Sequence, residues 1–455
     1  MSDEKLFGIL KQLSATAKKN VDEGISSRTV EPQDEQYFKW KVEKFEYTEK
    51  GVTDFGAKGD YFAKKSWFRA IIKLQESIKR SNEYNLAVQE IAKVFADSNA
   101  FPLYLDHFVA KILRIHLTDP QVKESNVESL IAVFLKDLRN EPVKFGAEVE
   151  LQGIALQPEE IEPSFGVKLR KTRIEDLEKE FPAYGFFTRI PLLPHPSAIL
   201  KIDSLARSAN EIQTEVERTI AILRLFKVGG VAYTVYRLSS ESITDRSASG
   251  TVTSGRPFEA RETYLISHDD EVRVKKFWKA VVREIPQSFF RFDAMGTDYL
   301  TIAYKRYSDA LLENGLIERR ITNDVMGLEA LLLKPGELQE LAYRLSVRIS
   351  KLFELLGRNQ YEVKKVVIDA YKVRNLFAHG GQLSYERKKK LEAKYSNVNN
   401  LLLSVLDCLR ILIILMLFGR RGKNEFIDLL DDSLIDRKRE EQLANIISQA
   451  KGIIG

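Results

Sequence analysis

The chain has 455 residues, of which 44% are hydrophobic and 30% charged, a composition typical of a globular protein with buried cores. Its one cysteine, Cys408, excludes a disulfide framework and a thiolate metal cluster, and the first residues lack the apolar run of a signal peptide, so we expect a cytoplasmic protein. The net charge of +5 comes from the C-terminal third, because residues 301–455 hold 26 Lys and Arg against 20 Asp and Glu, while the first 300 residues hold 44 against 45.

The first 141 residues divide into two parts. Residues 1–33 are polar and weakly patterned, and we expect them to form a polar tail. From residue 34 to residue 141, segments such as "WFRAIIKLQESIKR" and "NLAVQEIAKVFADS" repeat apolar residues at three- and four-residue spacing, which is typical of amphipathic helices. We therefore predict a helical N-terminal domain with three or four helices.

The pattern changes at Glu141-Pro142 and predicts a mixed α/β domain over residues 142–300. In "KFGAEVELQGIAL" apolar and polar residues alternate, which is typical of a half-buried strand. Other segments that indicate strands are "GVKLRKT", "FFTRIPLL", "ILKIDSLAR", "VAYTVYRL" and "FEARETYLI". Three segments indicate helices, namely "TRIEDLEKEF" with Thr172 as its N-cap, "ANEIQTEVERTIAILRLF" and "DDEVRVKKFWKAVVREI". Residues 239–257 are rich in Ser, Thr and Gly and are expected to form a mobile loop.

From residue 301 to residue 455 the patterned segments have helical periodicity, which predicts an all-α bundle of five or six helices. Residues 401–418 approach the roughly 17 to 18 residues of the shortest transmembrane helices. Asp407 and Arg410 lie in the middle of this segment, and charges at bilayer depth are costly, so we expect a buried helix with an internal ion pair and no membrane contact. The whole chain is predicted to be an α+β multidomain protein.

The stretch "VRNLFAHGG", Val373 to Gly381, has the most distinctive chemistry, because the chain holds only five histidines. Its Arg374, Asn375 and His379 fall near the end of a helix that two glycines stop. Arg374 and His379 lie about 140° apart on a helical wheel, whereas Asn375 and His379 share a face. The long arginine side chain can still reach sideways, so that both groups meet around one phosphate. The alternative is a histidine that only caps the helix.

Three segments in this order, "GLEALLL", "ELAYRLSVRI" and "RNLFAHGG", resemble the Apea-like branch of the HEPN superfamily. The resemblance is good over residues 301–418, loose over residues 142–181, and does not reach the N-terminal helices. It implies a HEPN-like helical bundle with metal-independent endoribonuclease activity at a site that two copies of the chain form together. It also implies RNA as the partner, either tRNA or mRNA, a homodimer, and a role in prokaryotic antiviral defence.

In such a site the RNA 2′-hydroxyl attacks the adjacent phosphorus, and the leaving 5′-oxygen takes up a proton. We assign proton transfer to His379, because an imidazole changes its charge near neutral pH. The forked guanidinium of Arg374 would stabilise the charged phosphoryl oxygens, and Asn375 would orient the phosphate or the imidazole. A second copy of the motif would supply both an acid and a base without a metal or another cofactor.

Other residues are candidates for supporting roles. Glu329 is expected to position Arg374 by a charge-assisted hydrogen bond, or else to lie on the helix surface. Arg344 and Arg348 either line the same cleft or pair with acidic neighbours such as Glu337. Two basic runs, Glu386–Lys390 and Arg420–Lys423, either follow the RNA backbone or form solvated faces. The candidate contacts within them are Lys388, Lys389, Lys390, Arg420 and Arg421.

Two rival functions stay open at this stage. In the first, the same bundle binds a nucleotide or RNA as a regulatory signal without cutting it. In the second, the bundle only dimerises. No P-loop, Rossmann glycine motif or HExxH motif is present, and His268-Asp269-Asp270 is expected to cap a helix, not to bind a metal.

Overall fold

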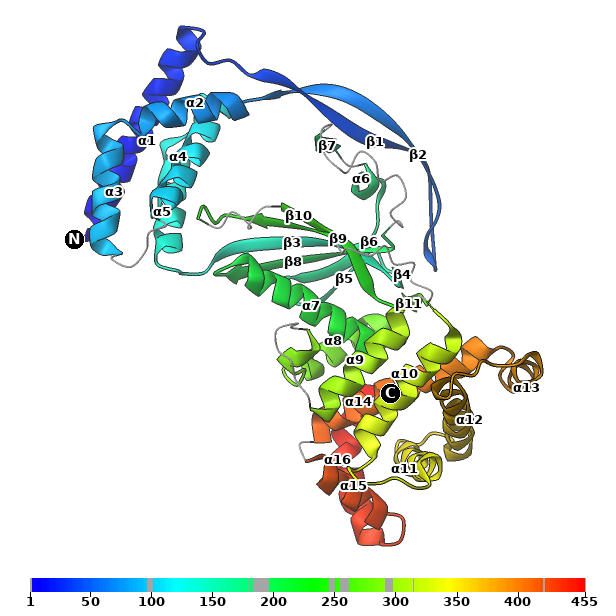
Figure 1. Cartoon of the computed structure of the whole chain (residues 1–455). Helices are drawn as coiled ribbons and strands as arrows, with labels where there is room; N and C mark the ends of the chain where they lie inside the picture. Colours follow the sequence, from blue (N-terminus) through cyan, green and yellow to red (C-terminus); the bar gives the residue numbers. More distant parts are fainter. Residues whose placement is uncertain are drawn as a thin grey trace.

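The computed structural model describes residues 2–95, 101–178, 180–182, 196–244, 250–253, 262–290, 298–313, 315–419 and 422–454. The protein combines α-helices and β-strands, as expected. Helices lie at both ends of the chain, and the strands lie between them (Figure 1).

The N-terminal part is helical, with α1 (Ser2–Ser26), α2 (Phe68–Ile78), α3 (Asn82–Val94), α4 (Phe101–Thr118) and α5 (Glu124–Leu138). These helices share a core of their own, to which α1 contributes Leu6, Leu10 and Leu13. The expected polar tail over residues 1–33 is therefore wrong for α1. Its apolar residues stand three or four positions apart among charged ones, and this narrow stripe packs on α3 and α4.

Residues 33–66, expected in a helical domain, form a long antiparallel ribbon instead. β1 (Gln33–Thr48) pairs with β2 (Gly51–Ser66) from end to end, and β7 (Glu180–Pro182) pairs with the other side of β1. The ribbon leads away from α2 and arches over the central sheet (Figure 1). Phe38 and Trp40, two positions apart, contact each other edge to face, which is a strand spacing of aromatic residues.

The central sheet has six strands in the order β10-β9-β3-β8-β6-β5, and their described pairings are antiparallel. These strands are β3 (Val143–Gln152), β5 (Glu160–Ser164), β6 (Val167–Lys171), β8 (Ala198–Ala206), β9 (Ala232–Ser240) and β10 (Gly250–Thr253). Helix α7 (Ala209–Phe226) packs on β3 and β8. Smaller elements complete this part, namely β4 (Ile154–Leu156), α6 (Ile174–Leu177), β11 (Tyr264–Ile266), α8 (Asp270–Val281) and the 3-10 helix Gln287–Phe289.

Two local predictions in this region need correction. The loop expected over residues 239–257 contains β10, whose consecutive Thr251, Val252 and Thr253 pair with β9. Thr172 does not cap α6, because its hydroxyl donates to the carbonyl of Pro196 over 2.8 Å, and Asp176 accepts the cap hydrogen bond from the backbone of Arg173. The strand predicted at "FFTRIPLL" lies outside the described residues.

The C-terminal part is all-helical in its described residues, which confirms that prediction. Its helices are α9 (Tyr299–Leu312), α10 (Ile317–Leu332), α11 (Leu341–Leu355), α12 (Gln360–Ala378), α13 (Tyr385–Tyr395), α14 (Val398–Gly419), α15 (Lys423–Asp432) and α16 (Arg437–Ile454). The described residues thus contain more helices than the five or six expected. One reason is that Ser396, with a φ of 65°, ends α13 and separates it from α14.

Helix α14 packs against α9, α10, α12 and α16. Among the described helices it is the one long and apolar enough to cross a membrane, and 83% of its apolar window is buried inside the protein. The expected internal ion pair is present, since Arg410 donates to Asp407 over 2.6 Å and also to the carbonyls of Leu225 and Phe226. The sheet and the bundle share one continuous hydrophobic core. The helices around α14 therefore pack against a buried, closely packed helix.

Candidate functional site

The end of α12 carries the Arg–Asn–His motif and is fixed by packing and by its turn. Helix α12 lies against α10, α11 and α14, with Val367 and Val373 buried. At its C-terminus Gly380 adopts a φ of +77°, and a Cβ on Gly381 would lie 2.6 Å from the side chain of Leu376. The double glycine therefore permits the tight turn that stops α12 directly after His379 and leads to α13.

A cleft of about 630 Å³ opens between the C-terminal half of α12 and α13. Seven of its eleven lining residues are polar or charged, and the charged ones are four cations and one carboxylate. The residues that line it are Asp369, Lys372, Val373, Asn375, Leu376, His379, Leu383, Arg387, Lys390, Leu391 and Lys394. A concave site of this size with an excess of cations suits an anionic ligand.

The single carboxylate of the cleft, Asp369, links its two walls. Asp369 is 5% exposed and accepts hydrogen bonds from Lys372 and Lys394, each over 2.9 Å, and from the hydroxyl of Tyr395 over 3.1 Å. Burial alone would raise the pKa of Asp369, but the hydrogen bonds from the two lysines bring that pKa below its ordinary value. The ionised carboxylate therefore joins α12 to α13 and keeps the two ammonium groups beside the cleft.

Arg387 and Lys390 contribute positive charge that is not used inside the protein. Both side chains are exposed on α13 and line the cleft. Within the described part of the chain neither has a carboxylate within ion-pair distance. Their donors are therefore available to a ligand such as a phosphate.

The structure brings two of the three motif residues together in the cleft. Asn375 and His379 share one face of α12, as their four-residue spacing predicts, and both line the cleft. The imidazole of His379 is exposed to solvent. A proton-transfer group that is reachable from solvent and surrounded by cations can approach a bound phosphodiester.

Arg374 lies beside the cleft and is not among the residues that line it. Its guanidinium donates to Glu329 on α10 and to the side-chain oxygen of Asn375, each over 3.2 Å, and lies over the ring of Tyr371. Burial, and then the negative charge of Glu329, raise the pKa of Tyr371 to about 12. The expected contact between Glu329 and Arg374 is therefore present, and Asn375 connects the arginine to the cleft.

The other supporting arginines lie on α11, away from the cleft lining. Arg348 is buried and donates to Glu337 and to Asp431, with distances of 2.7 to 2.8 Å. Its hydrogen bond lowers the pKa of Glu337 to about 2. Arg344 also pairs with Glu337, over 3.3 Å. The sequence left two alternatives open for Arg344 and Arg348, and the structure shows that both pair with acidic neighbours.

The candidate RNA-backbone residues differ in their position relative to the cleft. Lys390 lines the cleft, whereas Lys388 and Lys389 are exposed on α13 outside the cleft lining. Arg420 and Arg421 lie outside the described residues. Among the residues that the structure describes, no group of three His, Cys, Asp or Glu side chains is arranged to hold a metal ion.

The segment around His268 is held by hydrogen bonds and ion pairs within the protein. Asp270 accepts hydrogen bonds from the backbone of Ser267 over 2.9 Å and from the ammonium group of Lys227 over 2.5 Å. His268 itself lies 3.2 Å from Glu271, one turn further along. These contacts hold the start of α8. They are not the capping bonds expected from the sequence, because Asp269, the N-cap residue, makes no side-chain cap hydrogen bond.

Three charged residues of the cleft were missed from the sequence, namely Asp369, Lys372 and Lys394. The first and last of these are 25 positions apart and belong to two different helices, so no local spacing joins them. A signal was nevertheless available. The segment "YERKKKLEAKY" has helical propensity but only Leu391 as an aliphatic residue larger than alanine, which is unusual for a helix that packs into a core.

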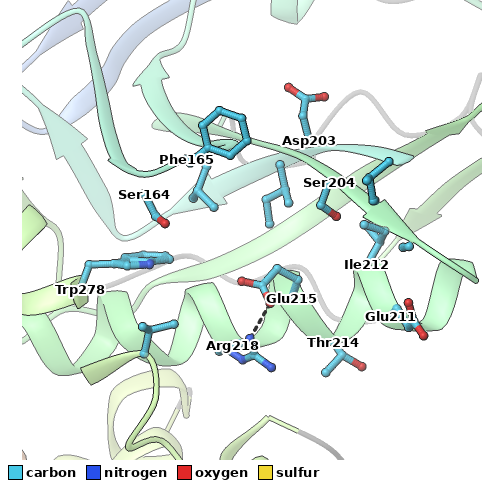
Figure 2. A pocket seen from close by; sticks show the side chains of 15 residues that line it. Ser164, Phe165, Asp203, Ser204, Glu211, Ile212, Thr214, Glu215, Arg218 and Trp278 are labelled. Carbon is cyan, nitrogen blue, oxygen red and sulfur yellow. Dashed lines mark hydrogen bonds and ion pairs between the residues drawn. The ribbon is translucent and has the colours of Figure 1, made fainter. Parts of the chain in front are cut away.

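A second cleft, of about 460 Å³, lies between β8 and α7 (Figure 2). Three carboxylates line it, Asp203, Glu211 and Glu215, against one cation, Arg218, which donates to Glu215 over 2.8 Å. It holds no histidine, cysteine or lysine. This acidic cleft does not suit an anionic ligand.

The chain matches no family model, no curated protein and no solved structure in the comparisons made.

Proposed function

We propose that the C-terminal bundle is HEPN-like and acts as a metal-independent endoribonuclease when two copies of the chain associate. The observation that carries this proposal is the placement of His379 and Asn375 on the wall of an open, cationic cleft. The chemistry of the cleft is what phosphodiester cleavage needs, namely cations for the phosphate and an imidazole for the proton.

The proposed reaction is an internal transfer that needs only proton carriers. The 2′-oxygen of one ribose forms a bond to the adjacent phosphorus while the bond from phosphorus to the 5′-oxygen breaks. The 2′-hydroxyl proton passes to one imidazole, and the 5′-oxygen receives a proton from another. His379 of one chain and His379 of a second copy fill these two roles.

The position of Arg374 is the reason for including a second copy. Within one chain Arg374 donates to Glu329 and Asn375 and lies outside the cleft lining. A guanidinium held in this way can present its remaining donors to a substrate that lies across two facing motifs. In this arrangement Glu329 positions Arg374, and Arg374 stabilises negative charge on the phosphoryl oxygens.

A regulatory protein that binds RNA or a nucleotide without cutting it is the second candidate. It is favoured by the same observation on Arg374, whose ion pair with Glu329 links α10 to α12 within one chain. This candidate predicts ligand binding in the cationic cleft with no cleavage.

A cleavage assay in EDTA distinguishes these candidates. Wild-type protein is incubated with single-stranded RNA and with its 2′-deoxy counterpart, and the products are sized and their ends identified. We expect RNA fragments with 2′,3′-cyclic phosphate ends, no cut in the 2′-deoxy strand, and a loss of at least about 100-fold in rate for His379→Ala.

The matched control is His268→Ala, which removes another solvent-exposed histidine far from the motif in sequence. It should leave the rate unchanged. Equal rates for wild type and His379→Ala, or equal cleavage of the 2′-deoxy strand, would contradict the endoribonuclease. Binding of RNA without any cleavage would favour the regulatory candidate.

A further inference from the structure

Helix α13 has the composition of a surface helix and not of a helix in a hydrophobic core. None of its residues is buried, and nine of the eleven are charged or aromatic, as its sequence "YERKKKLEAKY" shows. Its links to the rest of the bundle include the hydrogen bonds of Lys394 and Tyr395 to Asp369 on α12. In Figure 1 it stands out from the side of the bundle. A helix with this composition contributes little to hydrophobic stability, which points to a role in binding.

The first residue of α13 presents an aromatic ring to solvent. Tyr385 is 75% exposed, and the ammonium group of Lys389 lies 5.6 Å from the centre of its ring. Ser384 fixes the start of the helix by accepting a hydrogen bond from the backbone of Arg387 over 3.3 Å. The start of α13 is therefore fixed. Arg387 and Lys390, which line the cleft, follow Tyr385 by two and five positions along the chain, and Tyr385 itself lies outside the cleft lining.

An exposed ring beside a row of cations matches one kind of nucleic acid. The cations can follow a phosphate backbone, and the flat ring can stack on a base. In a duplex the base faces are covered by their neighbours, and in a single strand they are accessible. The cleft also has the size of a small-ligand site, which admits a nucleotide and not a duplex.

We propose that α13 selects single-stranded RNA, with Tyr385 as the platform for one base and with Arg387 and Lys390 as contacts for the adjoining phosphates. This inference rests on the proposed function in taking RNA as the ligand, and it adds the strand state that the site accepts. An unpaired nucleotide stacked on Tyr385 places the neighbouring phosphodiester over the cleft that His379 and Asn375 line.

The test measures binding without cleavage. In the full-length His379→Ala background, fluorescence anisotropy gives the dissociation constant of a labelled 12-nucleotide single strand and of a blunt duplex of the same length. We expect the single strand to bind more tightly, Tyr385→Ala to weaken single-strand binding about 5-fold or more, and Tyr385→Phe to retain it. Duplex binding should change little in either variant.

Tyr361→Ala is the matched control, because Tyr361 is 71% exposed and lies at the opposite end of α12 from the motif. It should bind both RNAs like the parent, and thermal melting should show that all variants are folded. The inference is overturned if Tyr385→Ala and Tyr361→Ala behave alike, if the duplex binds as tightly as the single strand, or if neither RNA binds. Cleavage is measured separately from binding. If Tyr385→Ala leaves cleavage unchanged, only this inference is contradicted. If RNA binding depends on Tyr385 but the RNA is not cleaved, only the proposed nuclease activity is contradicted.

Discussion

Two clefts within the described part of the chain have similar size and opposite charge. The cleft between α12 and α13 measures about 630 Å³ and has four cations and one carboxylate in its wall. The cleft between β8 and α7 measures about 460 Å³ and has three carboxylates and one cation (Figure 2). Size alone therefore does not distinguish the two clefts, whereas their charge and the imidazole of His379 do.

The two clefts also differ in how their charges are used. In the acidic cleft the one cation, Arg218, is paired with Glu215 on the same helix. In the cationic cleft the one carboxylate, Asp369, is shared by two lysines, while Arg387 and Lys390 have no carboxylate partner within the described residues. Unpaired charge of one sign raises the local concentration of a ligand of the other sign. RNA should therefore distinguish the two clefts sharply.

The largest expected difference concerns two arginines, Arg374 beside the cationic cleft and Arg218 in the wall of the acidic one. Arg374→Ala should lower the rate of RNA cleavage by about 100-fold or more, because it removes a preorganised donor for the phosphoryl charge. Arg218→Ala, the equivalent change in the acidic cleft, should leave the rate unchanged. Single-turnover kinetics measure both. Equal effects of the two variants would remove the distinction on which the assignment depends.

A second prediction separates the stability of the bundle from the chemistry of its cleft. Glu337→Gln should lower the free energy of unfolding at neutral pH by about 1–3 kcal/mol, because Arg348 loses a charged hydrogen-bond partner. Helix α15, which supplies Arg348's other partner Asp431, lies at a different end of the bundle from α13 (Figure 1). The affinity of the cationic cleft for RNA should therefore stay at the wild-type value under folding conditions.

The pH dependence of this variant follows from the pKa of Glu337, which Arg348 lowers to about 2 in the folded protein. A lowered carboxyl pKa stabilises the fold fully above the pKa of the unfolded chain, about 4.3, and the stabilisation is lost as the pH falls toward 2. Urea unfolding should thus show a constant difference between wild type and Glu337→Gln from pH 7 to about pH 5, and a vanishing one near pH 2. A difference that persists undiminished in acid would contradict the ion pair.

The smallest expected effect concerns a single cation of the cleft. Lys390→Gln should weaken RNA binding and reduce the slope of log affinity against log salt by about 0.7, the share of one phosphate contact on a single strand. Glu211→Gln in the acidic cleft should leave this slope unchanged. Titrations at several salt concentrations measure the slopes. An unchanged slope in Lys390→Gln would place the phosphates elsewhere.

Local spacing was enough to predict the long amphipathic helices and the strands with clear alternation. Helix α7, helix α14 with its Asp407–Arg410 pair, and strand β3 all follow from it. The wrong predictions have a common cause, because charged residues interrupt the apolar pattern of these segments. In α1 charged and polar residues separate the buried apolar ones, and in β1 and β2 charged residues separate the aromatic ones. In such segments tertiary contacts decide the structure.

Only part of the candidate site could be predicted from the sequence, for a similar reason. His379 and Asn375 belong to one helical turn, so their four-residue spacing predicts a shared face. The link from Asp369 to Lys394 depends on how α13 folds back beside α12, and nothing within either helix encodes that. The position of Arg374 against α10 likewise required the packing of two helices that are adjacent in space and distant in sequence.

Crosslinking of RNA to the full-length protein tests most directly which cleft holds the ligand. A single-stranded RNA with 4-thiouridine is bound to His379→Ala and irradiated, and the modified peptides are identified by mass spectrometry. The account predicts crosslinks within residues 365–395, on α12 and α13. Crosslinks confined to residues 203–218, or to other parts of the chain with none on α12 and α13, would contradict it.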